Sequence, residues 1–183
     1  MRIRTVVTGH DANGKAVVAS DSEVDGITTA LAPNAEFHRL WGADAPPTFP
    51  DDGSPPAMTS YFPPLGGFRV GFFSVPPESE AAPAPDVDLA EAFIDFEAKL
   101  PGLAERMEPG APGMHTTPTV DFEVVVEGEV WLELDDGVEV HLRTGDCVVQ
   151  NGTRHAWRNH GDTTARMVVV LVGAHHEASH PVA

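Results

Sequence analysis

Residues 115–159 read HTTPTVDFEVVVEGEVWLELDDGVEVHLRTGDCVVQNGTRHAWRN, and this part of the chain carries the strongest indication of its fold. It predicts short strands at residues 124–126, 130–134, 138–142 and 147–149, each apolar or β-branched and bounded by Gly, Asp or Asn. The intervening turns are EGE at 127–129, DDG at 135–137 and TGD at 144–146. Such closely spaced turn signals are typical of an antiparallel sandwich or small barrel.

The stretch resembles the cupin family, whose members are small double-stranded β-helix barrels. The first family motif reads roughly G-x5-H-x-H-x3,4-E-x6-G. His115 stands at its first His, Asp121 at its Glu and Gly128 at its closing Gly, while Thr117 replaces the second His. The carboxylate is therefore one methylene shorter than in the family pattern, and one metal-binding imidazole is missing.

The second family motif, roughly G-x5-P-x-G-x2-H-x3-N, follows in the expected order. Gly145, Gly152, His155 and Asn159 match it, with Gln150 at the Pro position and one residue fewer before it. The resemblance covers residues 113–172 and implies an all-β fold. We expect a cupin double-stranded β-helix, or jelly-roll barrel, with extra N-terminal strands and one α-helix.

Metal-binding residue types stand at both ends of the stretch. Residues two apart in a strand point to the same face, so His115 and Asp121 share a face if the strand continues through Pro118. The barrel implied by the resemblance can aim these two side chains and His155 at one interior point. Two imidazoles and a carboxylate form the ligand set of non-haem Fe(II) enzymes, and Mn, Ni and Zn accept the same donors. The predicted cofactor is therefore a divalent metal, Fe, Mn, Ni or Zn, bound by His115, Asp121 and His155.

Two alternatives stay open at this site. Glu123 is a rival carboxylate, although the spacing to Gly128 favours Asp121. A barrel that has lost one His also fits a metal-free pocket in which the polar residues only form hydrogen bonds.

Several further residues are candidates for contact with a small-molecule ligand. Thr117 leaves room for water or substrate where the family has a His, and two Trp residues are able to line an apolar cavity. Arg154 either meets a substrate carboxylate at the rim or points outward. The predicted substrate-binding residues are Thr117, Glu123, Trp131, Trp157 and Asn159. The sequence assigns no catalytic residue.

The remaining chain predicts additional strands and one helix. Strands are expected at residues 2–8, 16–19, 36–41, 68–75 and 165–172, with a loop at 21–33 and Pro-rich surface excursions at 43–64 and 76–85. Residues 86–107 predict a helix that Asp86 or Asp88 caps and that Pro101 interrupts or ends.

These elements predict one structural domain. Residues 1–85 supply strands and Pro-rich loops that pack on the barrel, 86–107 the helix, 108–174 the cupin core and 175–183 a tail. The N-terminal hairpin leaves strand edges that need covering. Because the resemblance implies that cupins often cover such edges by pairing protomers, a homodimer is expected.

Composition limits the partners and the location. The net charge is −17 and only 11 residues are Lys or Arg, which argues against binding to nucleic acid or to an anionic membrane. No signal peptide is visible and the single Cys147 forms no internal disulfide, so a cytoplasmic location is expected. Cys147 is interpreted as a small core residue, and the tail residues His175, His176 and His180 as inert.

These observations lead to one functional hypothesis and one alternative. The hypothesis is a metal-dependent small-molecule enzyme of the cupin type, related to oxygenases, isomerases or cyclases, that acts on a partly apolar or aromatic substrate. The alternative is a non-catalytic barrel that binds a small molecule and has a degenerate metal site.

Overall fold

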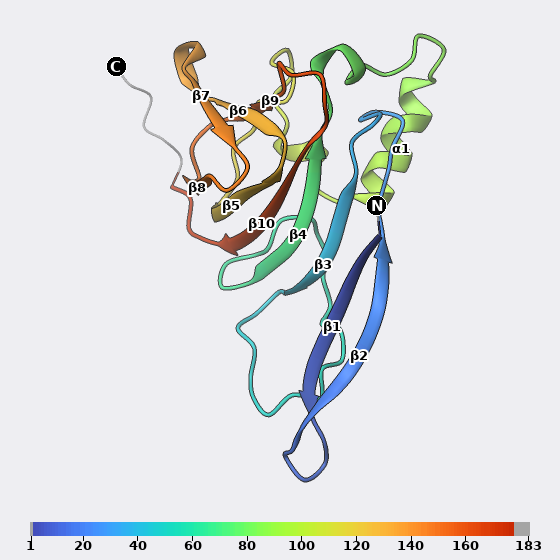
Figure 1. The fold of residues 1–183 in the computed structure, drawn as a ribbon, viewed down its shortest axis with the longest axis vertical. Coiled ribbons are helices and arrows are strands. Elements are labelled where there is room, and N and C mark those ends of the chain that lie inside the picture. The colour runs from blue at the N-terminus through green and yellow to red at the C-terminus, as the bar shows by residue number, and fades with distance from the viewer. Residues whose placement is uncertain (1, 178–183) are drawn as a thin grey trace.

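A computed structural model describes residues 2–177, and in this part the chain folds mainly as β-strands with one α-helix (Figure 1). The strands are β1 (Arg2–His10), β2 (Ala16–Asp25), β3 (Phe37–Ala43), β4 (Phe68–Val75), β5 (Thr119–Glu127), β6 (Glu129–Glu133), β7 (Glu139–Arg143), β8 (Cys147–Asn151), β9 (Ala156–Arg158) and β10 (Ala165–Gly173). The helix α1 spans Leu89–Lys99. The predicted all-β class, with N-terminal strands and one helix, is confirmed.

Two sheets form the barrel. A five-stranded sheet has the order β3-β4-β10-β5-β8, and a three-stranded sheet has the order β7-β6-β9. All the strand pairs in both sheets are antiparallel. A buried apolar cluster comprises Val125, Val130, Leu132, Leu142, Ala165 and Met167. Burial of this cluster between the sheets supplies the main hydrophobic stabilisation of the barrel.

Strand β5 inverts the usual burial pattern along its first half. Asp121 and Glu123 point inward and are buried, whereas Phe122 between them is 45% exposed. From Val125 onward an apolar side chain again faces inward. Because buried polar groups are costly without partners, this inversion marks a part of the interior that is built for something other than packing.

The β1–β2 hairpin extends away from the barrel (Figure 1). Strand β2 continues to Asp25, so the predicted loop at residues 21–33 starts too early: its first five residues belong to the strand. The hairpin contacts the loop after β3, where the His10 amide donates a hydrogen bond to the Asp51 carbonyl at 2.7 Å. Gly9 packs so closely against Asp52 that an added Cβ would lie 2.2 Å from its carbonyl oxygen, which explains the need for glycine there.

Helix α1 is shorter than the predicted 86–107 segment. Asp88 is the N-cap, and its carboxylate accepts hydrogen bonds from the amides of Ala90 and Glu91. The helix ends at Lys99, directly before Leu100 and Pro101, because proline lacks the amide that would continue it. A separate 3₁₀ turn covers Ala104–Arg106, and two others cover Glu78–Glu80 and Asp135–Gly137.

The helix and the segment after it pack over part of the barrel. Phe96, Leu100 and Leu103 form a second buried cluster, against which Phe37, Tyr61 and Met107 pack. Among residues 2–177, no helix is both long and apolar enough to cross a membrane.

Candidate functional site

A cavity of about 530 Å³ lies between the barrel interior and the segments around α1. Its walls are mainly apolar and include Phe37, Phe73, Phe96, Trp157, Val169 and Leu171. Two imidazoles and two carboxyl groups also line it, those of His115, His155, Asp121 and Glu123. A largely apolar cavity with a few convergent polar groups is typical of a small-molecule site.

His115 and His155 form a cross-strand pair. Their backbones exchange two hydrogen bonds, of 2.9 Å from the His115 amide and 3.0 Å from the His155 amide. The ring centroids lie 4.1 Å apart. His115 precedes β5 and sits in an isolated bridge, so a separate pairing and not one continuous strand through Pro118 positions its ring.

Hydrogen bonds fix the tautomer of both imidazoles. Nδ1 of His115 lies 2.9 Å from the Gly113 carbonyl, and Nδ1 of His155 lies 2.9 Å from the Thr153 carbonyl. Since a carbonyl only accepts, both Nδ1 atoms must donate, which leaves Nε2 of each ring as an acceptor. Burial lowers the pKa of His115, and burial together with the neighbouring His115 lowers the pKa of His155 to about 4. Both rings are therefore neutral at pH 7.

Asp121 and Glu123 form a second pair on adjacent inward positions of β5. Their exposed fractions are 2% and 3%, and one oxygen of each, Oδ1 of Asp121 and Oε2 of Glu123, has no hydrogen-bond partner. Burial raises the pKa of Asp121 to about 6. Burial and the charge of Asp121 raise the pKa of Glu123 to about 8. Unpartnered buried carboxyl groups are costly, which suggests a functional reason for keeping them.

The cavity thus contains two pairs of side chains, one of imidazoles and one of carboxyl groups. The ionisable neighbour that contributes to the pKa shift of His155 is His115, and the one that contributes to the pKa shift of Glu123 is Asp121. Within residues 2–177, no three His, Cys, Asp or Glu side chains come together closely enough to hold a metal ion. His115, Asp121 and His155 line one cavity, but in this arrangement they do not fit a three-ligand metal centre.

The predicted substrate-binding residues fall into two groups. Glu123 and Trp157 line the cavity. Thr117 is buried and accepts a hydrogen bond from the Thr119 hydroxyl at 2.8 Å, outside the cavity lining. Asn159 donates to the carbonyls of Val75 and Thr163, so its amide joins neighbouring segments of the fold.

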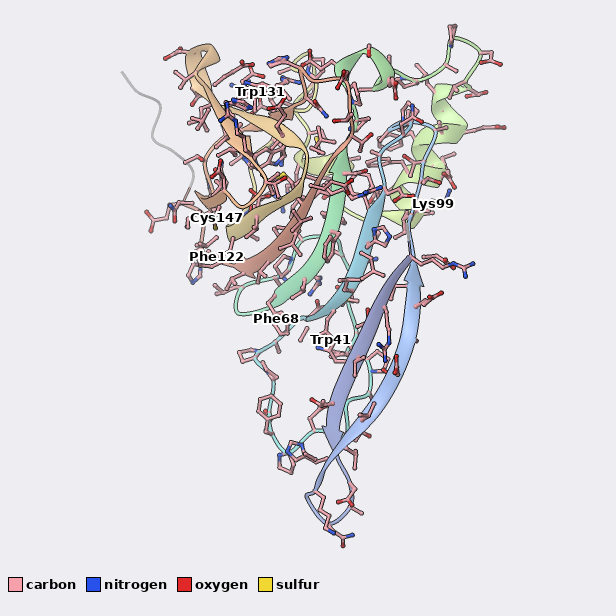
Figure 2. All side chains as sticks on the ribbon, in the orientation of Figure 1. Trp41, Phe68, Lys99, Phe122, Trp131 and Cys147 are labelled. Carbon is pink, nitrogen blue, oxygen red and sulfur yellow. The ribbon has the colours of Figure 1, made fainter. Side chains whose placement is uncertain are left out.

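Trp131 also lies outside the cavity lining. Figure 2 shows it at the end of the molecule that carries the three-stranded sheet. Its ring stacks on His141 with centroids 4.3 Å apart and planes at 4°, and His160 packs nearby at 4.9 Å. Trp131 points away from the cavity because inward positions on β6 are occupied by Val130 and Leu132.

Sequence reasoning missed the contribution of the segment before β4. The Pro-rich residues 43–64 were expected to form a surface excursion, yet Tyr61 and Phe62 line the cavity. Burial raises the pKa of the Tyr61 hydroxyl, and the nearby charge of Glu123 adds to the effect. The available signal was that Tyr61, the one tyrosine in the chain, stands next to Phe62 within a polar segment.

Two further expectations concern Cys147 and the tail. Cys147 is exposed, not a core residue, because β8 is an edge strand and the residue occupies an outward position (Figure 2). His175 and His176 are exposed, and Nε2 of His176 lies 3.2 Å from the Gly152 carbonyl. His180 lies outside the described residues.

Comparison with known proteins gives a consistent family assignment. Residues 104–171 match the family model described as "Cupin domain". The Neurospora crassa protein named cupin-domain-containing oxidoreductase srdB is 31% identical over 172 residues, covering 91% of this chain and 71% of that protein. The Aspergillus oryzae oryzines biosynthesis cluster protein J is 46% identical over 68 residues, covering 36% and 38% of the two chains.

The extent of similarity differs between these proteins. The matched part spans less than two fifths of the length of relatives such as protein J. Among solved structures, the Schizosaccharomyces pombe Cnp3 cupin domain is 10% identical with a TM-score of 0.48, covering 93% of this chain and 87% of that one.

Proposed function

Because this chain belongs to the cupin family, we propose that it is an enzyme that transfers protons on a small, partly apolar or aromatic substrate bound in the cavity. The reaction class is isomerisation or cyclisation. The observation that carries the proposal is the pair of buried carboxyl groups, Asp121 and Glu123, with unpartnered oxygens at the wall of an apolar cavity. Relatives named as biosynthesis cluster proteins agree with a role in small-molecule metabolism.

The two carboxyl groups suit complementary roles. Both are neighbours on one face of β5, so a single bound substrate is able to reach both. Burial raises the pKa of Asp121 less than that of Glu123, to about 6 against about 8. At pH 7 Asp121 then accepts a proton as general base, and Glu123 holds one as general acid.

The imidazole pair supports this chemistry from another part of the wall. The Nε2 atoms of His115 and His155 are acceptors, and the hydrogen bonds from both Nδ1 atoms hold the rings in place. They bind and orient a donor group of the substrate. The apolar walls lower the local polarity, which strengthens each polar contact.

A second candidate function is the metal-dependent enzyme. Its support is the adjacent pair of free Nε2 atoms, which are suitable metal ligands, together with relatives named as cupin-domain-containing oxidoreductases. A divalent metal, Fe, Mn, Ni or Zn, would supply Lewis acidity or oxygen activation. A third ligand would have to come from the substrate or from a rearranged Asp121.

Hydrogen–deuterium exchange into an apolar carbon acid tests the proton-transfer function. The probe is phenylacetone in D₂O with a chelator present, and proton NMR follows loss of its methylene signal. We expect the wild-type protein to accelerate exchange, and Asp121→Asn to reduce the rate at least about 100-fold, as for a lost general base.

Glu127→Gln is the matched control, because Glu127 lies on the same strand outside the cavity. It should exchange the probe at the wild-type rate. Bound phenylacetone without accelerated exchange would contradict the proton-transfer proposal and favour a binding barrel. Exchange that requires added metal would favour the second candidate.

A further inference from the structure

Several polar groups of the cavity are hydrogen-bond acceptors without a donor. Each imidazole offers only Nε2, because its Nδ1 hydrogen is already donated to a backbone carbonyl. Asp121 and Glu123 add two carboxyl oxygens that have no partner. Acceptors that are buried without donors favour a ligand that brings the donors itself.

Positive charge is missing from the same wall. Among the described residues that line the cavity, none is Arg or Lys. Arg154, next to His155 in sequence, is engaged by Glu108 at 2.8 Å and by Asp135 at 2.9 Å. Arg39 donates to the carbonyls of Met58 and Ser60 and does not line this cavity. The alternative that Arg154 meets a substrate carboxylate therefore loses its support.

An anionic ligand would meet two unfavourable effects here. Its charge would leave water for an apolar cavity without a cationic partner, which is costly. It would also face the Asp121 carboxylate, which repels a like charge strongly because the surroundings are of low polarity. A hydroxyl or an ammonium group meets neither effect and brings hydrogen-bond donors to the acceptor groups of the lining.

We propose that the Asp121–Glu123 end of the cavity binds a hydroxyl or amine group carried on an apolar, alkyl or aromatic body, and that it rejects carboxylates and phosphates. The inference rests on the proposed function only in using the same cavity, and it names the substrate class. A cavity that recognises carboxylates or phosphates would be expected to contain an Arg or Lys, and the described lining of this cavity has neither.

A matched series of three ligands with one aromatic body tests the inference. 2-Phenylethanol, 2-phenylethylamine and phenylacetate differ only in the polar head group. Isothermal titration at neutral pH, with a chelator and about 0.15 M salt, gives their dissociation constants and screens the long-range field of the acidic protein. We expect the alcohol and the amine to bind at least about tenfold more tightly than phenylacetate.

Charge-neutral variants locate the discrimination. Asp121→Asn should reduce the preference for the amine over phenylacetate by about tenfold, and Glu123→Gln should reduce it less, because Glu123 already holds its proton at pH 7. Glu127→Gln removes the same charge from outside the cavity and should leave the preference unchanged. This comparison separates a local effect from the effect of the net charge of −17.

The outcomes distinguish this inference from the proposed function. Tighter or equal binding of phenylacetate by the wild-type protein would overturn the inference, whether or not proton exchange is observed. Selective binding of the donors without catalysed exchange would support the inference and contradict the proposed function. Failure of all three ligands to bind would overturn the inference, and the exchange experiment with phenylacetone would still decide the proposed function.

Discussion

His115 and His155, forty positions apart in the sequence, exchange both backbone hydrogen bonds and hold their imidazole rings 4.1 Å apart. This contact joins the two motifs that the sequence places at opposite ends of residues 115–159. It groups the imidazoles with each other and leaves Asp121 with Glu123.

Metal titration distinguishes this pairing from the predicted triad. We expect Zn²⁺ or Ni²⁺ that enters the cavity to bind through the two Nε2 atoms, so His115→Ala or His155→Ala lowers the affinity at least about tenfold. Asp121→Asn should change it less than about threefold, because that carboxylate belongs to the other pair. Calorimetric titration of chelator-treated protein measures these affinities.

The exposed tail provides the control for metal titration. A double variant, His175→Ala with His176→Ala, removes two exposed surface ligands and should keep the cavity affinity unchanged. A loss in Asp121→Asn as large as that in the His variants would restore the three-ligand site predicted from the sequence.

The stability of the protein should depend on Glu123 between pH 6.5 and pH 8. Its pKa is raised from 4.5 to about 8 in the folded protein. The contribution of the Glu123 carboxyl group to the free energy of unfolding is therefore present at low pH and is lost as the pH rises through the folded-state pKa. His155 makes the stability rise with pH, but only below its unfolded-state pKa of 6.5. We expect Glu123→Gln to be more stable than wild type at pH 8 by on the order of 1–2 kcal/mol, and more nearly equal at pH 6.5.

Urea unfolding at the two pH values, with a chelator present, measures this difference. Glu127→Gln should show the wild-type pH dependence, because Glu127 lies outside the cavity. If Glu123→Gln keeps the full wild-type pH dependence, the carboxyl group of Glu123 is not buried as described.

The N-cap of α1 gives a prediction that separates two neighbouring aspartates. Asp88→Ala should lower the free energy of unfolding by about 1 kcal/mol, because its carboxylate accepts from the amides of Ala90 and Glu91. Asp86→Ala should have little effect, since Asp86 precedes the cap and is exposed. Chemical denaturation measures both variants. Equal losses would mean that the helix begins earlier than Leu89.

Association of two copies remains a prediction, and the β1–β2 hairpin is where we expect it. The β1–β2 hairpin is a separate two-stranded sheet, and such hairpins are only marginally stable in water. On it, Val6 and Val18 are 50% and 64% exposed, and a second copy could cover them. Light scattering should give twice the mass of one chain. The double variant Val6→Lys with Val18→Lys should give a monomer, because like charges would face each other across the apolar contact.

A wild-type monomer at micromolar concentration would rule out this association and leave the fold assignment unaffected. Val138→Lys is a suitable control, because Val138 is also exposed but lies beside the 3₁₀ turn between β6 and β7.

The barrel and most of its strands could be predicted from the amino-acid sequence. Alternating apolar residues and turn signals are local properties, so β4, β6, β7, β8 and β10 could be predicted near their observed bounds. Strand β9 was not among the predicted strands, because its residues lack an apolar run. The first half of β5 entered the prediction only as the strand assumed to continue through Pro118 to Asp121. The helix was found, but its end was placed too late because Pro101 was allowed as an interruption.

The grouping of the cavity side chains into two pairs became visible in the folded structure. The two motifs correctly indicated His115, Asp121 and His155 as cavity residues, but spacing along the chain cannot give the distance between side chains on different strands. The cross-strand bridge brings the imidazoles together, whereas the pleat of β5 pairs Asp121 with Glu123. The apolar wall from Tyr61, Phe62 and Phe96 comes from distant segments that local sequence patterns cannot place.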